Sequence, residues 1–186
     1  NGSYYFGTRE SGLIEFNKKT QTHKTYTVGN SKLASNFIVS LFKDSKGEIL
    51  VGLNGKLQKL NLQASIFQSL NVPENCGEIL SLAEAENGNL YLGTDALGLI
   101  EYQNSENNYK VINELGTNVR QVYFLNKNEL MVCSISLGIF IYNITSKEIT
   151  KLGSDIALKP WKDARFLSFH VDSDSILWVG NFKWGL

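Results

Sequence analysis

Residues 79–93, with the sequence ILSLAEAENGNLYLG, contain two short apolar runs on either side of a polar turn. The first run covers residues 79–82 and includes Ser81, the second covers residues 90–92, and Asn87 and Gly88 lie in the turn between them. Apolar runs joined by a turn that contains glycine indicate a β-hairpin. We therefore predict two adjacent antiparallel strands in this segment.

The same pattern recurs along the whole chain. The glycine at its end has counterparts at intervals of 45, 41, 40 and 47 residues, namely Gly7, Gly52, Gly93, Cys133 and Gly180. The residue two positions earlier is large and apolar in every copy: Tyr5, Leu50, Tyr91, Met131 and Trp178. Four copies also carry a glycine five positions later: Gly12, Gly98, Gly138 and Gly185. This agreement at several offsets indicates an internal repeat.

The length of the repeat and its apolar periodicity together predict the fold class. A period of 40 to 47 residues suits helical repeats of the HEAT type or a four-stranded propeller blade. Each copy contains short alternating runs, and no window carries an apolar stripe long enough for a packed helix. We therefore predict an all-β protein, a β-propeller of about four four-stranded blades.

The repeat also predicts where the blades lie. Residues 1–30 form a partial blade of three strands, residues 37–70, 78–113 and 118–152 form three whole blades, and residues 165–186 begin another. The chain opens and closes inside a repeat, so we expect a segment of a larger propeller. Closure of four blades, by pairing of the last inner strand with the first three strands, is the alternative.

Composition excludes several function classes. The 186 residues carry 18 Lys and Arg and 18 Asp and Glu, scattered singly, so the formal net charge is zero. Nucleic-acid and anionic-membrane binders need a basic face, which the sequence lacks. No apolar run approaches the roughly 20 residues that span a bilayer, and the start of the chain has no signal-peptide pattern.

The reactive residue types show no catalytic or metal-binding pattern. His23 and His170 occupy different repeat positions, and no Cys or Asp pattern completes a nucleophile or a ligand set. We therefore predict no catalytic residues, no metal and no cofactor. Cys76 and Cys133 give no disulfide framework, and we interpret them as free buried thiols. Asp44, Glu84 and Asp172, at or beside one repeat position, are interpreted as turn residues.

Ligand-binding candidates come from loop position. In a propeller, the loops between second and third strands share one face with the connections between blades, and we name this the loop face. Loops on a rigid scaffold are where binding sites usually lie. Trp161 and Trp184 offer flat apolar surfaces for a sugar ring or a protein partner. The other candidates on the loop face are polar: Arg9, Glu10, Asp95, Arg165, Asn181 and Lys183.

The repeat resembles the two-component regulator propeller repeat. The resemblance is carried by the segment 79–82, by Gly88, by residues 90–94 with the sequence LYLGT, and by Gly98-Leu99. Residues 167–169 and 177–180 provide a further match. The third whole blade departs most, with Gln121, Asn128 and Cys133 at the diagnostic positions.

This resemblance implies a sensor. It suggests the periplasmic region of a hybrid two-component system from Bacteroidetes, in which the propellers precede a membrane segment and a histidine kinase outside this chain. Such a region is expected to be non-catalytic, to detect oligosaccharides, and to belong to a homodimeric inner-membrane receptor. Two other classes stay open: a docking module of a secretion-type assembly that binds protein or surface polysaccharide, and a propeller lyase or sialidase.

Overall fold

The computed structural model describes residues 2–153 and 165–182. These residues form antiparallel sheets in which strands adjacent in sequence pair with one another. The first sheet has three strands: β1 (Ser3–Gly7), β2 (Leu13–Asn17) and β3 (Thr22–Tyr26). The second has four: β4 (Ser40–Lys43), β5 (Ile49–Gly52), β6 (Leu57–Asn61) and β7 (Ile66–Leu70).

The remaining sheets follow the same order. The third sheet consists of β8 (Ile79–Glu84), β9 (Leu90–Thr94), β10 (Leu99–Gln103) and β11 (Asn108–Ile112). The fourth consists of β12 (Val119–Phe124), β13 (Glu129–Ser134), β14 (Gly138–Asn143) and β15 (Ile149–Lys151). The last described sheet pairs β16 (Phe166–Val171) with β17 (Leu177–Asn181).

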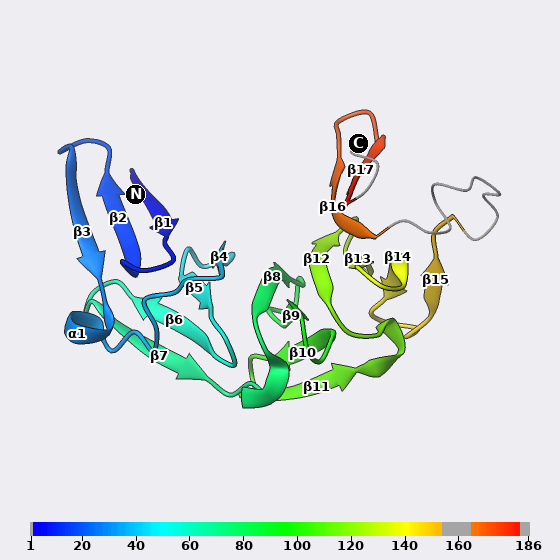
Figure 1. Cartoon of the computed structure of the whole chain (residues 1–186), viewed down its shortest axis with the longest axis horizontal. Helices are drawn as coiled ribbons and strands as arrows, with labels where there is room; N and C mark the ends of the chain where they lie inside the picture. Colours follow the sequence, from blue (N-terminus) through cyan, green and yellow to red (C-terminus); the bar gives the residue numbers. More distant parts are fainter. Residues whose placement is uncertain (1, 154–164, 183–186) are drawn as a thin grey trace.

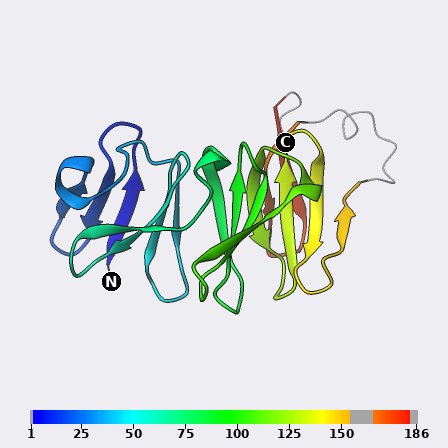
Figure 2. The same ribbon diagram turned by 90° about the horizontal axis from the view of Figure 1, so that it is seen from below.

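The sheets stand side by side along an open arc (Figures 1 and 2). β4, β8, β12 and β16 lie on the concave side, whereas β3, β7, β11 and β15 lie on the convex side (Figure 1). The first and last sheets occupy the two tips. This radial arrangement confirms the all-β fold class predicted from the repeat.

Short helices occupy three of the connections between sheets. α1 (Val28–Ser31) follows β3, and the 3-10 helices η1 (Glu74–Cys76) and η2 (Asn113–Leu115) follow β7 and β11. Sequence analysis predicts only loops there, because four or three residues are too few to show a helical period. None of the helices in the described part of the chain has the length and hydropathy needed to cross a membrane.

The hydrophobic core lies between successive sheets. The apolar residue two positions before the repeat glycine packs against the following sheet: Tyr91, for example, shares a cluster with Leu130 and Val132. Leu50 packs in the same way with Leu90 and Leu92. The residues one and three positions before the glycine therefore contact the preceding sheet. This alternation follows from the two-residue period of a strand.

The repeat glycine is required by close packing. A Cβ atom on Gly93 would lie 2.6 Å from Ser81 Oγ and 2.8 Å from the Val119 carbonyl oxygen of the next sheet. In the fourth sheet, Cys133 takes this position and is fully buried. Both Cys76 and Cys133 are free and buried, which confirms the prediction for the thiols.

Candidate functional site

The structure places the predicted loop-face residues on separate sheets. Arg9 and Glu10 lie between β1 and β2, Asp95 lies between β9 and β10, and Arg165 and Asn181 lie at the last sheet. The first and last sheets are at opposite tips of the arc (Figure 1). Trp161, Lys183 and Trp184 lie outside the described residues. The loop-face site therefore stays a prediction.

Arg9 and Glu10 are exposed at the first tip. The Arg9 guanidinium carbon lies 5.8 Å from the centre of the Phe37 ring, a cation–π contact that orients the side chain. Within residues 2–153 and 165–182, Glu10 makes no ion pair. Arg9 and Phe37 thus form a polar and aromatic surface beside the first connection between sheets.

Asp95 connects two loops through hydrogen bonds. Its carboxylate accepts a hydrogen bond from the Glu78 backbone N–H at 2.7 Å. Its own N–H donates to the Glu78 carbonyl at 3.2 Å, and its carbonyl accepts from the Asn118 N–H at 2.9 Å. These contacts give Asp95 a positioning role in the third sheet.

Arg165 and Asn181 are close together at the second tip. Asn181 pairs with Phe166 in the ladder between β16 and β17. The carbonyl of Arg165 accepts a hydrogen bond from the N–H of Phe182 at 3.0 Å. Phe182 is 75% exposed and was not singled out from the sequence. Its position in the sequence, directly between the candidate residues Asn181 and Lys183, could have identified it as a further candidate.

Two neighbouring grooves lie on the opposite face. We name this the turn face, formed by residues 44–48, 62–65, 85–89 and 104–107. A groove of about 570 Å³ opens there on the second sheet, lined among others by Lys43, Lys46, Glu48, Lys59 and Gln68. A neighbouring groove of about 410 Å³ shares Lys46 and Lys59 and extends to Glu84 and Asn104 of the third sheet. Sequence analysis did not predict them, because lysines scattered in sequence give no local pattern.

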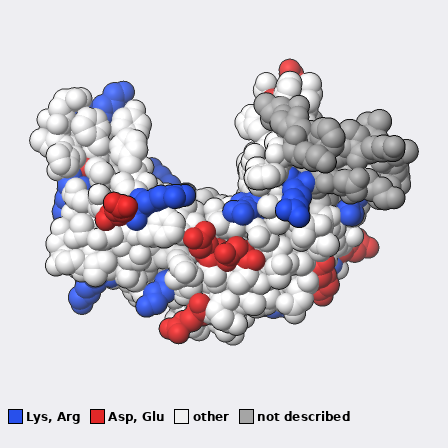
Figure 3. Space-filling model, viewed as in Figure 1, with Lys and Arg blue, Asp and Glu red and all other residues white. Residues whose placement is uncertain are grey.

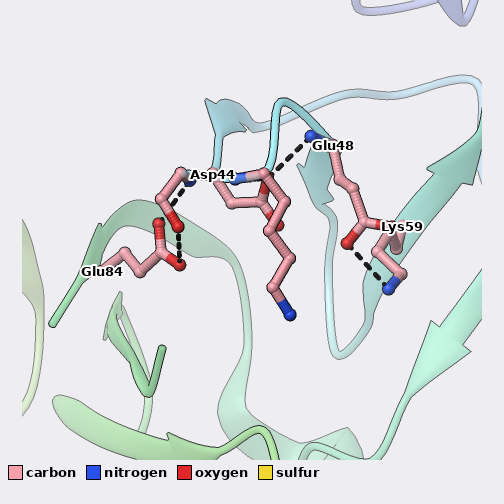
Figure 4. A network of polar contacts seen from close by, with 6 residues as sticks. Asp44, Glu48, Lys59 and Glu84 are labelled. Atoms are coloured by element: carbon pink, nitrogen blue, oxygen red, sulfur yellow. Dashed lines mark hydrogen bonds and ion pairs between the residues drawn. The ribbon is translucent and has the colours of Figure 1, made fainter. Parts of the chain in front are cut away.

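Hydrogen bonds fix the turn between β4 and β5 (Figure 4). Asp44 accepts hydrogen bonds from the backbone N–H groups of Lys46 at 3.1 Å and Glu48 at 2.7 Å. Asp172 holds the turn before β17 in the same way, by accepting from Asp174 and Ile176. Asp44 and Asp172 are therefore turn residues, as interpreted from the sequence.

Glu84 has a different role, because it connects two sheets. Its carboxylate accepts hydrogen bonds from the Ser45 N–H at 2.6 Å and the Ser45 hydroxyl at 2.9 Å (Figure 4). The turn of the second sheet is thus attached to the inner strand of the third.

The surface carries charges of both signs (Figure 3). Two ion pairs are present among the described residues: Lys59–Glu48 at 2.9 Å and Lys147–Glu101 at 3.6 Å. Residues 2–153 and 165–182 contain no group of three His, Cys, Asp or Glu side chains that could hold a metal ion. The surface is therefore polar, with local basic and acidic patches.

Comparison with known proteins identifies the architecture. No family model matches the chain, and no curated protein matches it. In structure, the chain matches the extracellular domain assigned to the hybrid two-component system BT3049 from B. thetaiotaomicron, with a TM-score of 0.80 over 97% of its length. The extracellular domain assigned to BT4673 from the same organism gives a TM-score of 0.83 over 100% of the chain. The chain has the fold of a β-propeller segment.

The propeller segment spans about a quarter of the matched sensor domains, 24% and 25% of their lengths. Sequence identity to them is 19% and 15%. A streptogramin B lyase structure also matches, with a TM-score of 0.70, 12% identity and coverage of 58% of that chain. At these identities the matches establish the fold. As far as the fold is concerned, they confirm the resemblance seen in the repeat.

Proposed function

We propose that this chain is a non-catalytic, ligand-binding segment of the extracellular sensor domain of a hybrid two-component system. The structural match to two such domains, over at least 97% of the chain, is the observation that supports this proposal. In the proposed receptor, the segment lies in the periplasm, and the full-length homodimeric protein carries its membrane span and histidine kinase outside this chain.

We propose further that the sensed ligand is an oligosaccharide bound at the loop face. Trp161 and Trp184 would stack on sugar rings, while Arg9, Glu10, Arg165, Asn181 and Lys183 would bind hydroxyl or carboxylate groups. Asp95 would support this site by holding the loop between β9 and β10. Binding would signal by favouring one arrangement of the receptor, which requires a difference in affinity between two arrangements.

Oligosaccharide binding by the purified protein tests this proposal. A glycan array followed by calorimetry should identify an oligosaccharide with a measurable Kd. Alanine at both Trp161 and Trp184 should weaken that binding by about tenfold or more, equivalent to about 1.4 kcal/mol. Ile66→Ala, an exposed apolar residue on β7, is the matched control and should leave the Kd unchanged.

Three results of this experiment would contradict the proposal. Unchanged affinity in the double tryptophan variant would remove the stacking role. Binding of a protein partner, with no saccharide bound, would favour a docking module instead. Cleavage of a bound substrate would favour an enzyme.

A further inference from the structure

The second sheet differs in charge from the first and third sheets at one ladder position, at which the fourth sheet pairs Met131 with Ile141. In the first sheet, Glu15 pairs with Tyr5, and in the third, Glu101 pairs with Tyr91. The same ladder position in the second sheet pairs Lys59 with Leu50. The charge at this position is therefore reversed in the second sheet.

Both glutamates are closed in by neighbouring side chains. Glu15 accepts hydrogen bonds from the hydroxyls of Tyr5 at 3.1 Å and Tyr26 at 2.7 Å. Glu101 accepts from Tyr91 at 3.0 Å and lies 3.6 Å from Lys147 of the next sheet, which leaves its side chain 10% exposed. The side chain of Lys59 is 29% exposed and faces both grooves of the turn face.

Positive charge is in excess in the larger groove. Its lining contains three lysines, Lys43, Lys46 and Lys59, and one carboxylate, Glu48. Glu48 pairs with Lys59 at 2.9 Å, while Lys43 and Lys46 make no ion pair within the described part of the chain. Two ammonium groups are thus free to bind an anion. The amides of Asn61, Gln63 and Gln68 in the same lining can bind hydroxyl groups.

The turn that carries Lys46 is held in place before any ligand arrives. Asp44 fixes it from within the second sheet, and Glu84 fixes it from the third sheet through Ser45 (Figure 4). A fixed backbone reduces the entropy lost when a ligand binds, which favours affinity.

We propose that this groove is a second saccharide subsite that binds the anionic group of an acidic oligosaccharide. Lys43 and Lys46 contact the anion directly. Lys59 breaks its ion pair with Glu48 and also binds the anion. The amide side chains bind neighbouring hydroxyl groups. The volume of about 570 Å³ lies within the range of small-ligand sites. This inference rests on the proposed function, because it names the class of saccharide that the segment senses.

Calorimetry with matched oligosaccharides tests the subsite. The probes are a trigalacturonate, a sulfated disaccharide and neutral maltotriose, each titrated into the purified protein. The Lys43→Gln/Lys46→Gln variant should lose at least tenfold in affinity for an acidic probe and keep its affinity for a neutral one. Lys127→Gln, an exposed lysine between β12 and β13 that lies outside both this groove and the loop face, is the control and should change neither. Comparison of the first two probes shows whether the anion is a carboxylate or a sulfate.

A gain of affinity gives an independent test. Glu48→Gln removes the carboxylate that competes for Lys59, so affinity for the acidic probe should rise several-fold. Salt from 50 to 500 mM should weaken that binding, because exposed charges are screened. A structural role for Glu48 alone would give no such rise.

Three outcomes overturn the subsite. Binding of neutral oligosaccharide alone would disprove it and leave the proposed function standing. An equal loss of affinity in the Lys127→Gln control would show a nonspecific charge effect. Failure to bind any saccharide would remove both the subsite and the proposed function.

Discussion

Single residues at repeated positions decide how closely neighbouring sheets approach. Gly93 is flanked by Ser81 of its own sheet and Val119 of the next, with no room for a side chain. The sequence predicts that a small residue is needed there, because four of the five copies carry glycine. It could not predict which atoms lie opposite.

We expect Gly93→Ala to destabilise the protein by about 1–3 kcal/mol, since overpacking forces the strands apart. The free energy of unfolding in urea measures this. Gly29→Ala is the control, because its added Cβ would meet only the Thr27 hydroxyl at 3.8 Å. Equal stability of the two variants would contradict the packing role.

Glu101 is a buried acid, 8% exposed as a residue, that accepts a hydrogen bond from the buried Tyr91 hydroxyl and pairs with Lys147. Glu101→Ala leaves that hydroxyl without its acceptor, and we expect a loss of about 1–3 kcal/mol in stability. Thermal and urea unfolding should show it. The exposed residue Glu106 provides the control. The stability of Glu106→Ala should equal that of the parent protein within experimental error.

Burial raises the pKa of the Cys133 thiol from 9.0 to about 12. The folded state therefore holds this proton more tightly than the unfolded state does. The resulting stability is fully present below pH 9 and is lost as the pH rises from 9 toward 12. We expect Cys133→Ala to lose less stability than the parent protein between pH 8 and pH 11. Parallel losses in urea unfolding series would contradict this.

At the scale of strands, the apolar period predicts the strands and their order well. The register shifts were missed: β8, β12 and β16 each carry one at equivalent positions, between Ile79 and Ser81, Val119 and Gln121, and Phe166 and Ser168. Each bulge inserts one extra residue, so that buried residues recur at a spacing of three, as Ile79 and Leu82 do, and such a short break in the two-residue period does not identify a bulge in the sequence.

Gln121 shows how a side chain can extend a sheet. Its amide donates to the Phe169 carbonyl at 2.9 Å and accepts from the Phe169 N–H at 2.9 Å. Serine occupies this position in the second sheet, where Ser40 donates to the Ile79 carbonyl at 2.6 Å. The sequence shows the exchange of Ser for Gln, but the partner is visible only in three dimensions.

We expect Gln121→Ala to weaken the attachment of β16 to the fourth sheet. The loss of two hydrogen bonds should reduce the protection of β16 amides by about 1–3 kcal/mol. Hydrogen exchange measured by mass spectrometry reports this directly. Gln63→Ala, exposed between β6 and β7, should leave the protection unchanged. Uniform loss of protection over all sheets would indicate global destabilisation instead.

At the scale of the whole molecule, the two tips expose apolar side chains that are buried at equivalent positions elsewhere. Tyr4 and Phe6 are 52% and 53% exposed, whereas their counterparts Leu90 and Leu92 are 3% and 0% exposed. Trp178 is 50% exposed, whereas Tyr91 is 1% exposed. We propose that the five sheets belong to one incomplete propeller and that further blades cover these faces.

A longer protein tests this arrangement. One additional repeat on each side should protect Trp178 from acrylamide quenching and shift its emission to shorter wavelength, because the indole becomes buried. The measurement uses a background in which Trp161 and Trp184 are phenylalanine. Equal quenching in the short and long proteins would contradict the arrangement.

The candidate site is less predictable than the fold. Loop position singled out Arg9, Asp95 and Arg165, but these lie on three sheets, and Asp95 holds backbone groups. The larger groove of the turn face forms only where the β4–β5 turn and the β6–β7 turn of the second sheet meet. A repeat predicts which residues are equivalent. A binding surface depends instead on the positions at which the copies carry different residues, such as the position of Lys59.

The sequence of the reading frame on both sides of these residues tests the sensor function most directly. We expect further propeller repeats, then one membrane span and a histidine kinase. A frame that ends in a secretion-sorting tail, or that carries no kinase, would contradict the sensor function and would make the loop face a protein-docking surface.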